Sequence, residues 1–94
     1  MLTLGEIQEK MSNLNNWALE SDEISKEFQF NSFKESVEFL KKISEVAEKY
    51  EHYPIVLINN KSVRITLSTY EERGLTEKDF LVAEEIDSIS ELNF

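Results

Sequence analysis

The sequence predicts an α+β fold, in which three helices cover one face of a four-stranded antiparallel sheet in the order α-β-β-α-β-β-α. Apolar residues recur at helical spacing over residues 33–51, and apolar and polar residues alternate along 63–68. Turn-forming residues separate the segments. The 94 residues contain neither repeats nor a linker, so we expect a single domain over residues 1–94.

A helix and a β-hairpin are predicted for the first third of the chain. Thr3 and Glu6 have the spacing of a capping box, and apolar residues follow at spacings of three and four. Segments 17–19 and 24–30 alternate in polarity. Ser21-Asp22 between them is typical of a turn, which makes a hairpin the expected structure.

The strongest helical pattern lies in the middle of the chain. Asn31 or Ser32 is expected to cap a helix that runs from Phe33 to about Glu51, and Pro54 is expected to end it. One apolar stripe along this helix should pack on the sheet. The stripe consists of Phe33, Val37, Leu40, Ile43, Ala47 and Tyr50, and Phe39 and Val46 widen it.

The pattern in the last third of the sequence predicts a second hairpin and a final helix. The continuous apolar run 55–58 predicts a strand that is buried on both faces. Residues 59–61 form a turn, and 63–67 alternate as expected for a half-buried strand. Thr76 and Asp79 resemble a helix cap. The apolar positions of the final helix are Phe80, Ala83, Ile86 and Ile89.

Composition excludes several classes of function. The chain has 19 acidic and 10 basic residues and a net charge of −9, which disfavours direct binding to nucleic acid or to an anionic membrane. It has no cysteine, and a single histidine cannot form a multi-histidine metal site, so no metal site is expected. Neither a leader-like segment nor an apolar run of about 20 residues is present, which predicts a cytoplasmic protein.

His52 is the main candidate for proton transfer, because it is the only imidazole in the chain. The alternative is that it caps carbonyl groups at the end of the long helix. Tyr53 and Tyr70 could donate hydrogen bonds to a ligand, or they could pack at the ends of strands.

Other polar residues have ordinary structural interpretations. Ser68 and Thr69 could satisfy a turn, and Asp79 could cap the last helix. No nucleophile elbow and no phosphate-binding glycine loop is present. The remaining acidic clusters are expected to be solvated surface. These are Glu20, Asp22, Glu23, Glu71, Glu72, Glu84 and Glu85.

Three segments resemble the signature of the pterin-4a-carbinolamine dehydratases. They are 48–54, with His52-Tyr53-Pro54, the strand 63–70, which ends in Thr69-Tyr70, and 74–79, which begins Gly-Leu-Thr and ends in Asp79. In that family, a Glu precedes His-His-Pro by four residues, a strand ends in Thr-His, and Gly-Leu-Thr and an Asp follow. The resemblance covers about residues 14–87 and implies the same fold.

The sequence departs from this pattern at several positions. Tyr53 stands where the family has the second histidine of its pair, and Tyr70 where it has the histidine after the strand. Asn60 replaces an aromatic residue, and Ile55 replaces an acidic one. His52 is therefore the one histidine of the set that remains.

The resemblance implies an enzyme that dehydrates 4a-hydroxytetrahydropterins such as 4a-hydroxytetrahydrobiopterin to the quinonoid dihydropterin, and so recycles the pterin. His52 would be the acid–base group, with Tyr53 and Tyr70 as hydrogen-bond donors beside it. The pterin would be the substrate, and no cofactor is expected. By the same resemblance, the substrate-binding residues would be Glu48, Glu51, Pro54, Ser68, Thr69 and Asp79. Of these, Glu48, Ser68, Thr69 and Asp79 would position the ring or His52.

The resemblance also implies a homodimer or homotetramer, and the apolar run 55–58 favours association because an exposed apolar strand would aggregate. Two alternatives to an enzyme stay open at this point. One is a pterin-binding homologue that does not turn over its ligand. The other is a dimeric protein-interaction module, which the family's second role as an accessory to a transcription factor suggests.

Overall fold

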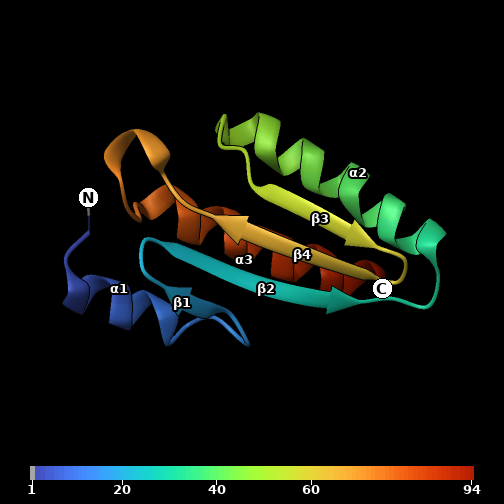
Figure 1. The fold of residues 1–94 in the computed structure, drawn as a ribbon, viewed down its shortest axis with the longest axis horizontal. Helices are drawn as coiled ribbons and strands as arrows, with labels where there is room; N and C mark the ends of the chain where they lie inside the picture. Colours follow the sequence, from blue (N-terminus) through green and yellow to red (C-terminus); the bar gives the residue numbers. More distant parts are fainter. Residues whose placement is uncertain (1) are drawn as a thin grey trace.

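A computed structural model describes residues 2–94 and has the predicted order of elements (Figure 1). Every predicted helix and strand is present, and one short 3-10 helix, η1, was not predicted. The elements are α1 Leu4–Met11, β1 Ala18–Glu20, β2 Glu23–Gln29, α2 Phe33–Tyr50, β3 Ile55–Asn59, β4 Ser62–Leu67, η1 Tyr70–Glu72 and α3 Glu77–Asn93.

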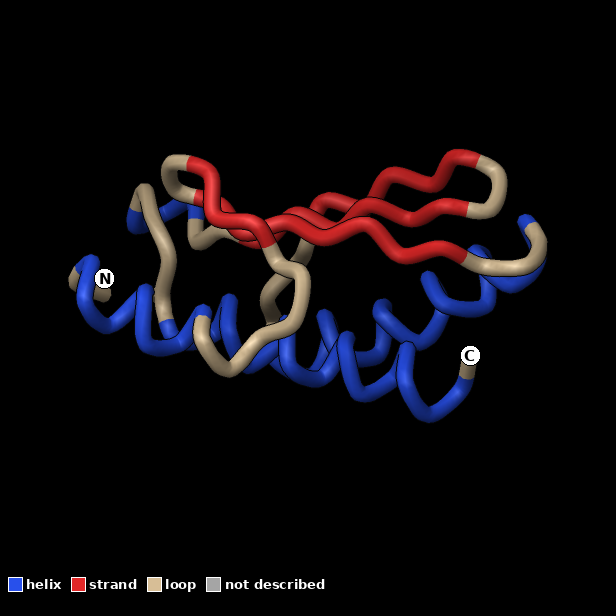
Figure 2. Tube along the Cα trace, turned by 90° about the horizontal axis from the view of Figure 1, so that it is seen from below, coloured by secondary structure: helices blue, strands red, loops and turns tan. Residues whose placement is uncertain are grey.

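The four strands form one antiparallel sheet in the order β1-β2-β4-β3. Strand β4 pairs with both β2 and β3, so β4 lies inside the sheet and β3 lies at its edge. Figure 2 shows the helices on one side of the sheet, as predicted. None of the helices among the described residues is long and apolar enough to cross a membrane.

The core lies between the sheet and the two long helices. Alternate residues of β4 face it, and Val63, Ile65 and Leu67 are completely buried. Phe39 of α2 and Ile86 of α3 are also completely buried against this surface. The period-two pattern of β4 therefore pointed to the correct face. The stripe predicted for α2 was only partly correct, because Ile43 and Ala47 are buried whereas Phe33 is 57% exposed.

The prediction for β3 was wrong about burial. The side chains of Ile55 and Leu57 are 54% and 62% exposed, whereas Val56 and Ile58 pack against the core. The helices cover only one face of the sheet, so a strand in it can bury only alternate residues, whatever its sequence.

The end of α2 also differs from the prediction. The helix ends at Tyr50, and Glu51 adopts a left-handed conformation with φ 50° and ψ 45° as its C-cap. The Glu51 N–H donates to the Ala47 and Glu48 carbonyls, so the backbone turns away before Pro54 is reached. Pro54 therefore does not end the helix.

Polar contacts attach α3 to the first hairpin. The Trp17 indole nitrogen donates to both oxygens of Asp87, at 3.0 and 3.1 Å, and the Lys26 ammonium lies 2.8 Å from the same carboxylate. All three side chains are mostly shielded from solvent. The contacts set the position of α3 relative to β2, and thereby that of the residues at its N-terminus.

Candidate functional site

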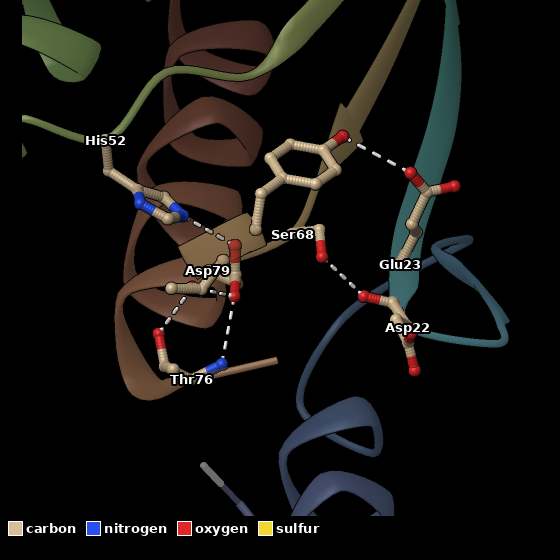
Figure 3. Close-up of polar contacts among 8 residues, drawn as sticks. Asp22, Glu23, His52, Ser68, Thr76 and Asp79 are labelled. Atoms are coloured by element: carbon tan, nitrogen blue, oxygen red, sulfur yellow. Dashed lines mark hydrogen bonds and ion pairs between the residues drawn. The ribbon is translucent and has the colours of Figure 1, made fainter. Parts of the chain in front are cut away.

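His52 follows the left-handed C-cap of α2, which turns its side chain toward the start of α3. The residue is only 7% exposed, and its backbone N–H donates to the Ala47 carbonyl at 3.0 Å. Its ring nitrogen Nε2 lies 2.6 Å from Oδ1 of Asp79 (Figure 3). The imidazole therefore pairs with a carboxylate and does not cap the helix carbonyls.

Asp79 is completely buried in the first turn of α3 and accepts hydrogen bonds on both oxygens. Its Oδ2 accepts from the backbone N–H of Thr76 at 2.9 Å and from the Thr69 hydroxyl at 2.8 Å. The contact to Thr76 is the one that a capping box requires. Asp79 therefore caps the helix and binds His52 at the same time (Figure 3).

The contact with Asp79 decides which nitrogen of His52 is free. The carboxylate accepts, so Nε2 carries the hydrogen of this bond and Nδ1 is left for another partner. Within residues 2–94, no buried side-chain nitrogen or oxygen lacks a hydrogen-bond partner. The His52 ring also lines a cleft, which is described next. An imidazole held this way by a carboxylate is a common arrangement for proton transfer.

A cleft of about 240 Å³ lies beside the imidazole, and we call it the His52 cleft. The two phenols at its rim, Tyr53 and Tyr70, are 58% and 53% exposed, so they border the cleft without filling it. Its wall consists of Glu51, His52, Tyr53, Ser68, Tyr70 and Glu71. His52 also lines a neighbouring hollow of about 410 Å³, together with Thr69, Thr76 and Lys78.

Each phenol has a carboxylate partner. The Tyr70 hydroxyl donates to Oε2 of Glu23 at 3.3 Å, and burial, followed by the negative charge of Glu23, raises the pKa of Tyr70. A hydrogen bond to Glu48 is the main cause that raises the pKa of Tyr53. Both side chains are therefore neutral phenols at neutral pH.

The other residues predicted for the site divide into two groups. Ser68 and Glu51 line the His52 cleft, and the Ser68 hydroxyl donates to the Asp22 carbonyl at 2.7 Å. Thr69 faces Asp79 and the neighbouring hollow. In the part of the chain that the structure describes, Glu48 and Pro54 are not part of the cleft wall.

Two acidic residues at the site were missed in the sequence, where they were taken for solvated surface. Glu71 lines the cleft, and Glu23 holds the Tyr70 hydroxyl. Adjacency to Tyr70 was an available signal for Glu71. No local pattern indicated Glu23, which is distant in sequence. Among residues 2–94, no three histidine, aspartate or glutamate side chains are grouped as a metal ion would require.

Comparisons with known proteins agree with this architecture. The model of the family described as pterin 4 alpha carbinolamine dehydratase matches residues 1–89. A protein of Sulfolobus acidocaldarius, assigned by name to the pterin-4-alpha-carbinolamine dehydratases, is 38% identical over 84 residues, which are 89% of this chain and 92% of that one.

Solved structures give the same result. The crystal structure of a transcriptional coactivator/pterin dehydratase from Brucella melitensis superimposes with a TM-score of 0.91 at 30% identity, over 95% of this chain and 97% of that one. A pterin dehydratase-like RuBisCO assembly factor of the alpha-carboxysome shares the fold, with a TM-score of 0.65 at 20% identity over 79% of this chain and 86% of its own. Because the family model spans nearly the whole sequence and a close relative matches along most of its length, the chain belongs to the pterin-4-alpha-carbinolamine dehydratase family.

Proposed function

We propose that this protein catalyses the dehydration of a 4a-hydroxytetrahydropterin to the quinonoid dihydropterin and water. The observation that supports this most strongly is the buried pair of His52 and Asp79 beside an open cleft. The membership of the chain in the dehydratase family supports the same reaction.

The reaction delivers one proton to the leaving hydroxyl and removes one proton from the pterin ring, and it involves no change of oxidation state. The bond between carbon 4a and its hydroxyl oxygen breaks, and the lone pair of the neighbouring nitrogen forms a carbon–nitrogen double bond. The hydroxyl takes a proton and leaves as water, while a ring nitrogen gives up a proton. One group that can both donate and accept a proton near neutral pH is sufficient for both transfers.

His52 is the residue that we assign to this exchange. Its ring lines the cleft, and Asp79 fixes the ring by holding Nε2, which leaves Nδ1 for the substrate. An imidazole that carries hydrogens on both nitrogens would deliver a proton through Nδ1 to the departing hydroxyl. The neutral ring that remains would then accept the proton from the pterin nitrogen, and the Asp79 carboxylate would favour the correct tautomer throughout.

Tyr53 and Tyr70 are assigned to substrate binding at the rim of the cleft. Each phenol offers one hydrogen and two lone pairs, and because the pKa of each is raised, both stay protonated at neutral pH and can donate a hydrogen bond. Both phenols stand where the family pattern has histidines. This substitution favours a second candidate function, which is pterin binding without turnover.

A direct assay on a 4a-hydroxytetrahydropterin separates the two functions. We expect the wild-type protein to accelerate water loss above the uncatalysed rate, and His52→Ala to lose about 10²–10⁴-fold of that acceleration, the usual contribution of an acid–base group. His52→Gln, which keeps a polar side chain at the buried position, guards against a simple folding defect. The exposed substitution Glu84→Gln serves as the control and should keep the wild-type rate.

The outcome also tests the alternative. Pterin binding without acceleration would reject the enzymatic proposal and favour the binding protein. In that case the double substitution Tyr53→His and Tyr70→His should create activity, because it restores the family's histidine set. Equal rates for wild type and both His52 variants would show that the imidazole does not take part.

We also propose that the protein associates with further copies of itself, as a homodimer or homotetramer. The exposed apolar side chains of the edge strand β3 support this, because a bare apolar edge is otherwise an aggregation site. A second copy would cover Ile55 and Leu57 on that strand.

A further inference from the structure

Glu23 has no role in the reaction described so far, although it holds a residue of the candidate site. The Tyr70 hydroxyl donates to Oε2 of Glu23 at 3.3 Å, across a sequence separation of 47 residues (Figure 3). Among the described residues, the wall of the His52 cleft includes Tyr70 but not Glu23. Glu23 lines a second cleft, of about 370 Å³, which shares Tyr70 with the first. The bond therefore draws the phenol oxygen toward the second cleft.

The stability of the first hairpin does not explain a glutamate at this position. Glu23 is the first residue of β2 and pairs directly with Glu20 of β1. Two like charges that face each other across an antiparallel pair of strands are unfavourable. The contact with Tyr70 gives the Glu23 carboxylate a role that lies outside the hairpin.

The Tyr70 ring could close the His52 cleft if nothing held it. The side chain is 53% exposed, and the three residues of η1, in which it lies, are all exposed, so packing does not fix its rotamer. The cleft measures about 240 Å³, whereas small-molecule sites usually measure about 300–1,000 Å³. A phenol ring that turned into this cleft would leave too little room for a ligand.

We propose that Glu23 is a positioning residue, which holds the Tyr70 ring back from the His52 cleft and so keeps that cleft open. The carboxylate accepts the hydrogen of the phenol, and the ring stays at the rim, where it borders both clefts. Tyr70 stands where the family pattern has the smaller ring of a histidine, so the need for such a tether arises from this chain's own sequence. The identity of the ligand rests on the proposed function, whereas the position of the ring does not.

The size of the effect depends on the fraction of molecules in which the cleft is open. A ligand that binds only the open form has an apparent dissociation constant that rises in inverse proportion to that fraction. Loss of a hydrogen bond to a carboxylate shifts such an equilibrium by about tenfold. Glu23→Ala should therefore raise Kd and KM by about tenfold and leave kcat unchanged, because the open form reacts as before.

The first measurement needs no ligand. The chain has one histidine and three tyrosines, so contacts between the His52 and Tyr70 rings can be resolved by NMR. We expect nuclear Overhauser contacts between these rings to be stronger in Glu23→Ala than in the wild type. Glu23→Gln, whose amide oxygen still accepts from the phenol, should resemble the wild type. The control Glu20→Ala removes the same charge from the residue paired with Glu23 and should also resemble the wild type.

The second measurement uses a non-reacting dihydropterin for Kd and a 4a-hydroxytetrahydropterin for kcat and KM. Glu23→Ala should show the tenfold rise in Kd and KM, and Glu23→Gln should recover most of the affinity. In Tyr70→Ala, which lacks the ring, the addition of Glu23→Ala should change Kd no further, because Glu23 acts only through that ring.

The two measurements distinguish this proposal from the proposed function. Equal ring contacts in the wild type and Glu23→Ala would overturn the role of Glu23, even if the protein is an active enzyme. Stronger contacts in Glu23→Ala, in a protein that neither binds nor converts the pterin, would support this role and reject the enzyme. An equal loss of affinity in Glu20→Ala, or a further loss when Glu23→Ala is added to Tyr70→Ala, would also overturn the role of Glu23.

Discussion

Asp79 shows how a single residue connects the fold to the chemistry. Its place three residues after Thr76 predicted a helix cap, and the structure confirms that contact. The resemblance to a family placed Asp79 at the site, but no local pattern paired it with His52. Capping depends on residues that are close in sequence, whereas His52 lies 27 residues away and approaches only when α2, β3 and α3 are packed.

We expect Asp79→Asn to lower both stability and activity. The amide keeps the size of the side chain but loses its charge. It also places an NH₂ group, which cannot accept, opposite one of the three groups that donate to Asp79, which are His52 Nε2, the Thr69 hydroxyl and the Thr76 N–H. Losing charge-assisted hydrogen bonds at a fully buried position should lower the free energy of unfolding by about 2–4 kcal/mol, measured by urea denaturation. At a temperature where the variant is folded, kcat should fall more than KM rises, because His52 loses its fixed tautomer.

Glu84→Gln is the matched control, since it makes the same chemical change at an exposed position of α3 and should alter stability by no more than about 0.5 kcal/mol. Equal stability of Asp79→Asn and the wild type would mean that the buried contacts contribute nothing net. Unchanged kcat in the folded variant would show that Asp79 does not orient the catalytic group.

Tyr53 and Tyr70 were recognised from the sequence, but their partners were not. Tyr70 bonds to Glu23 across 47 residues, and that glutamate had been taken for solvated surface. In a chain with 19 acidic residues, no single carboxylate is distinctive before the fold is known. The residue types of a site can therefore be read from this sequence, whereas their pairing requires the tertiary contacts.

At the scale of elements, the end of α2 illustrates the limits of local rules. Proline was expected to stop the helix, but Glu51 does so first by adopting a left-handed conformation. That conformation usually belongs to glycine, because a side chain makes it costly. Nothing in the residue type of Glu51 indicates it.

We predict that Glu51→Gly stabilises the protein. Glycine adopts a φ of 50° without steric cost, which should raise the free energy of unfolding by about 0.5–1 kcal/mol in a urea titration. Glu45→Gly, at an exposed position inside α2, should instead lower it by about 1 kcal/mol. If both variants are destabilised equally, the left-handed C-cap is not strained. The same glycine variant in the dehydration assay reveals whether the Glu51 side chain contributes to the cleft.

Strand β3 shows a second limit. Four consecutive apolar residues were interpreted as burial on both faces, but the sheet has helices on one face only and β3 lies at its edge. Strand β4 was predicted correctly because its apolar and polar residues alternate, and the apolar ones mark the buried side. A run without alternation leaves the exposed side to be decided by the architecture.

At the scale of the whole molecule, periodicity and turn residues were sufficient to predict the order and type of the elements. They did not predict the clefts. The His52 cleft combines the end of α2, the approach to β3 and the end of β4, and a neighbouring cleft of about 370 Å³ adds the β1–β2 turn. Each hollow exists only because segments from different hairpins converge. The sequence alone therefore predicted the scaffold well and the shape of the site poorly.

The exposed edge strand predicts the assembly state. Light scattering coupled to size exclusion should give a mass of two or four chains for the wild type, and Leu57→Lys should shift it to one chain, because a charge on an edge strand prevents a second copy from docking. The side chain of Leu57 is 62% exposed, so the variant should stay folded, which circular dichroism checks. Leu92→Lys makes the same change at the other end of the chain, on α3, where the leucine is 83% exposed, and should leave the mass unaltered. A monomeric wild type, or dissociation by Leu92→Lys alone, would show that β3 is not the surface through which the copies meet.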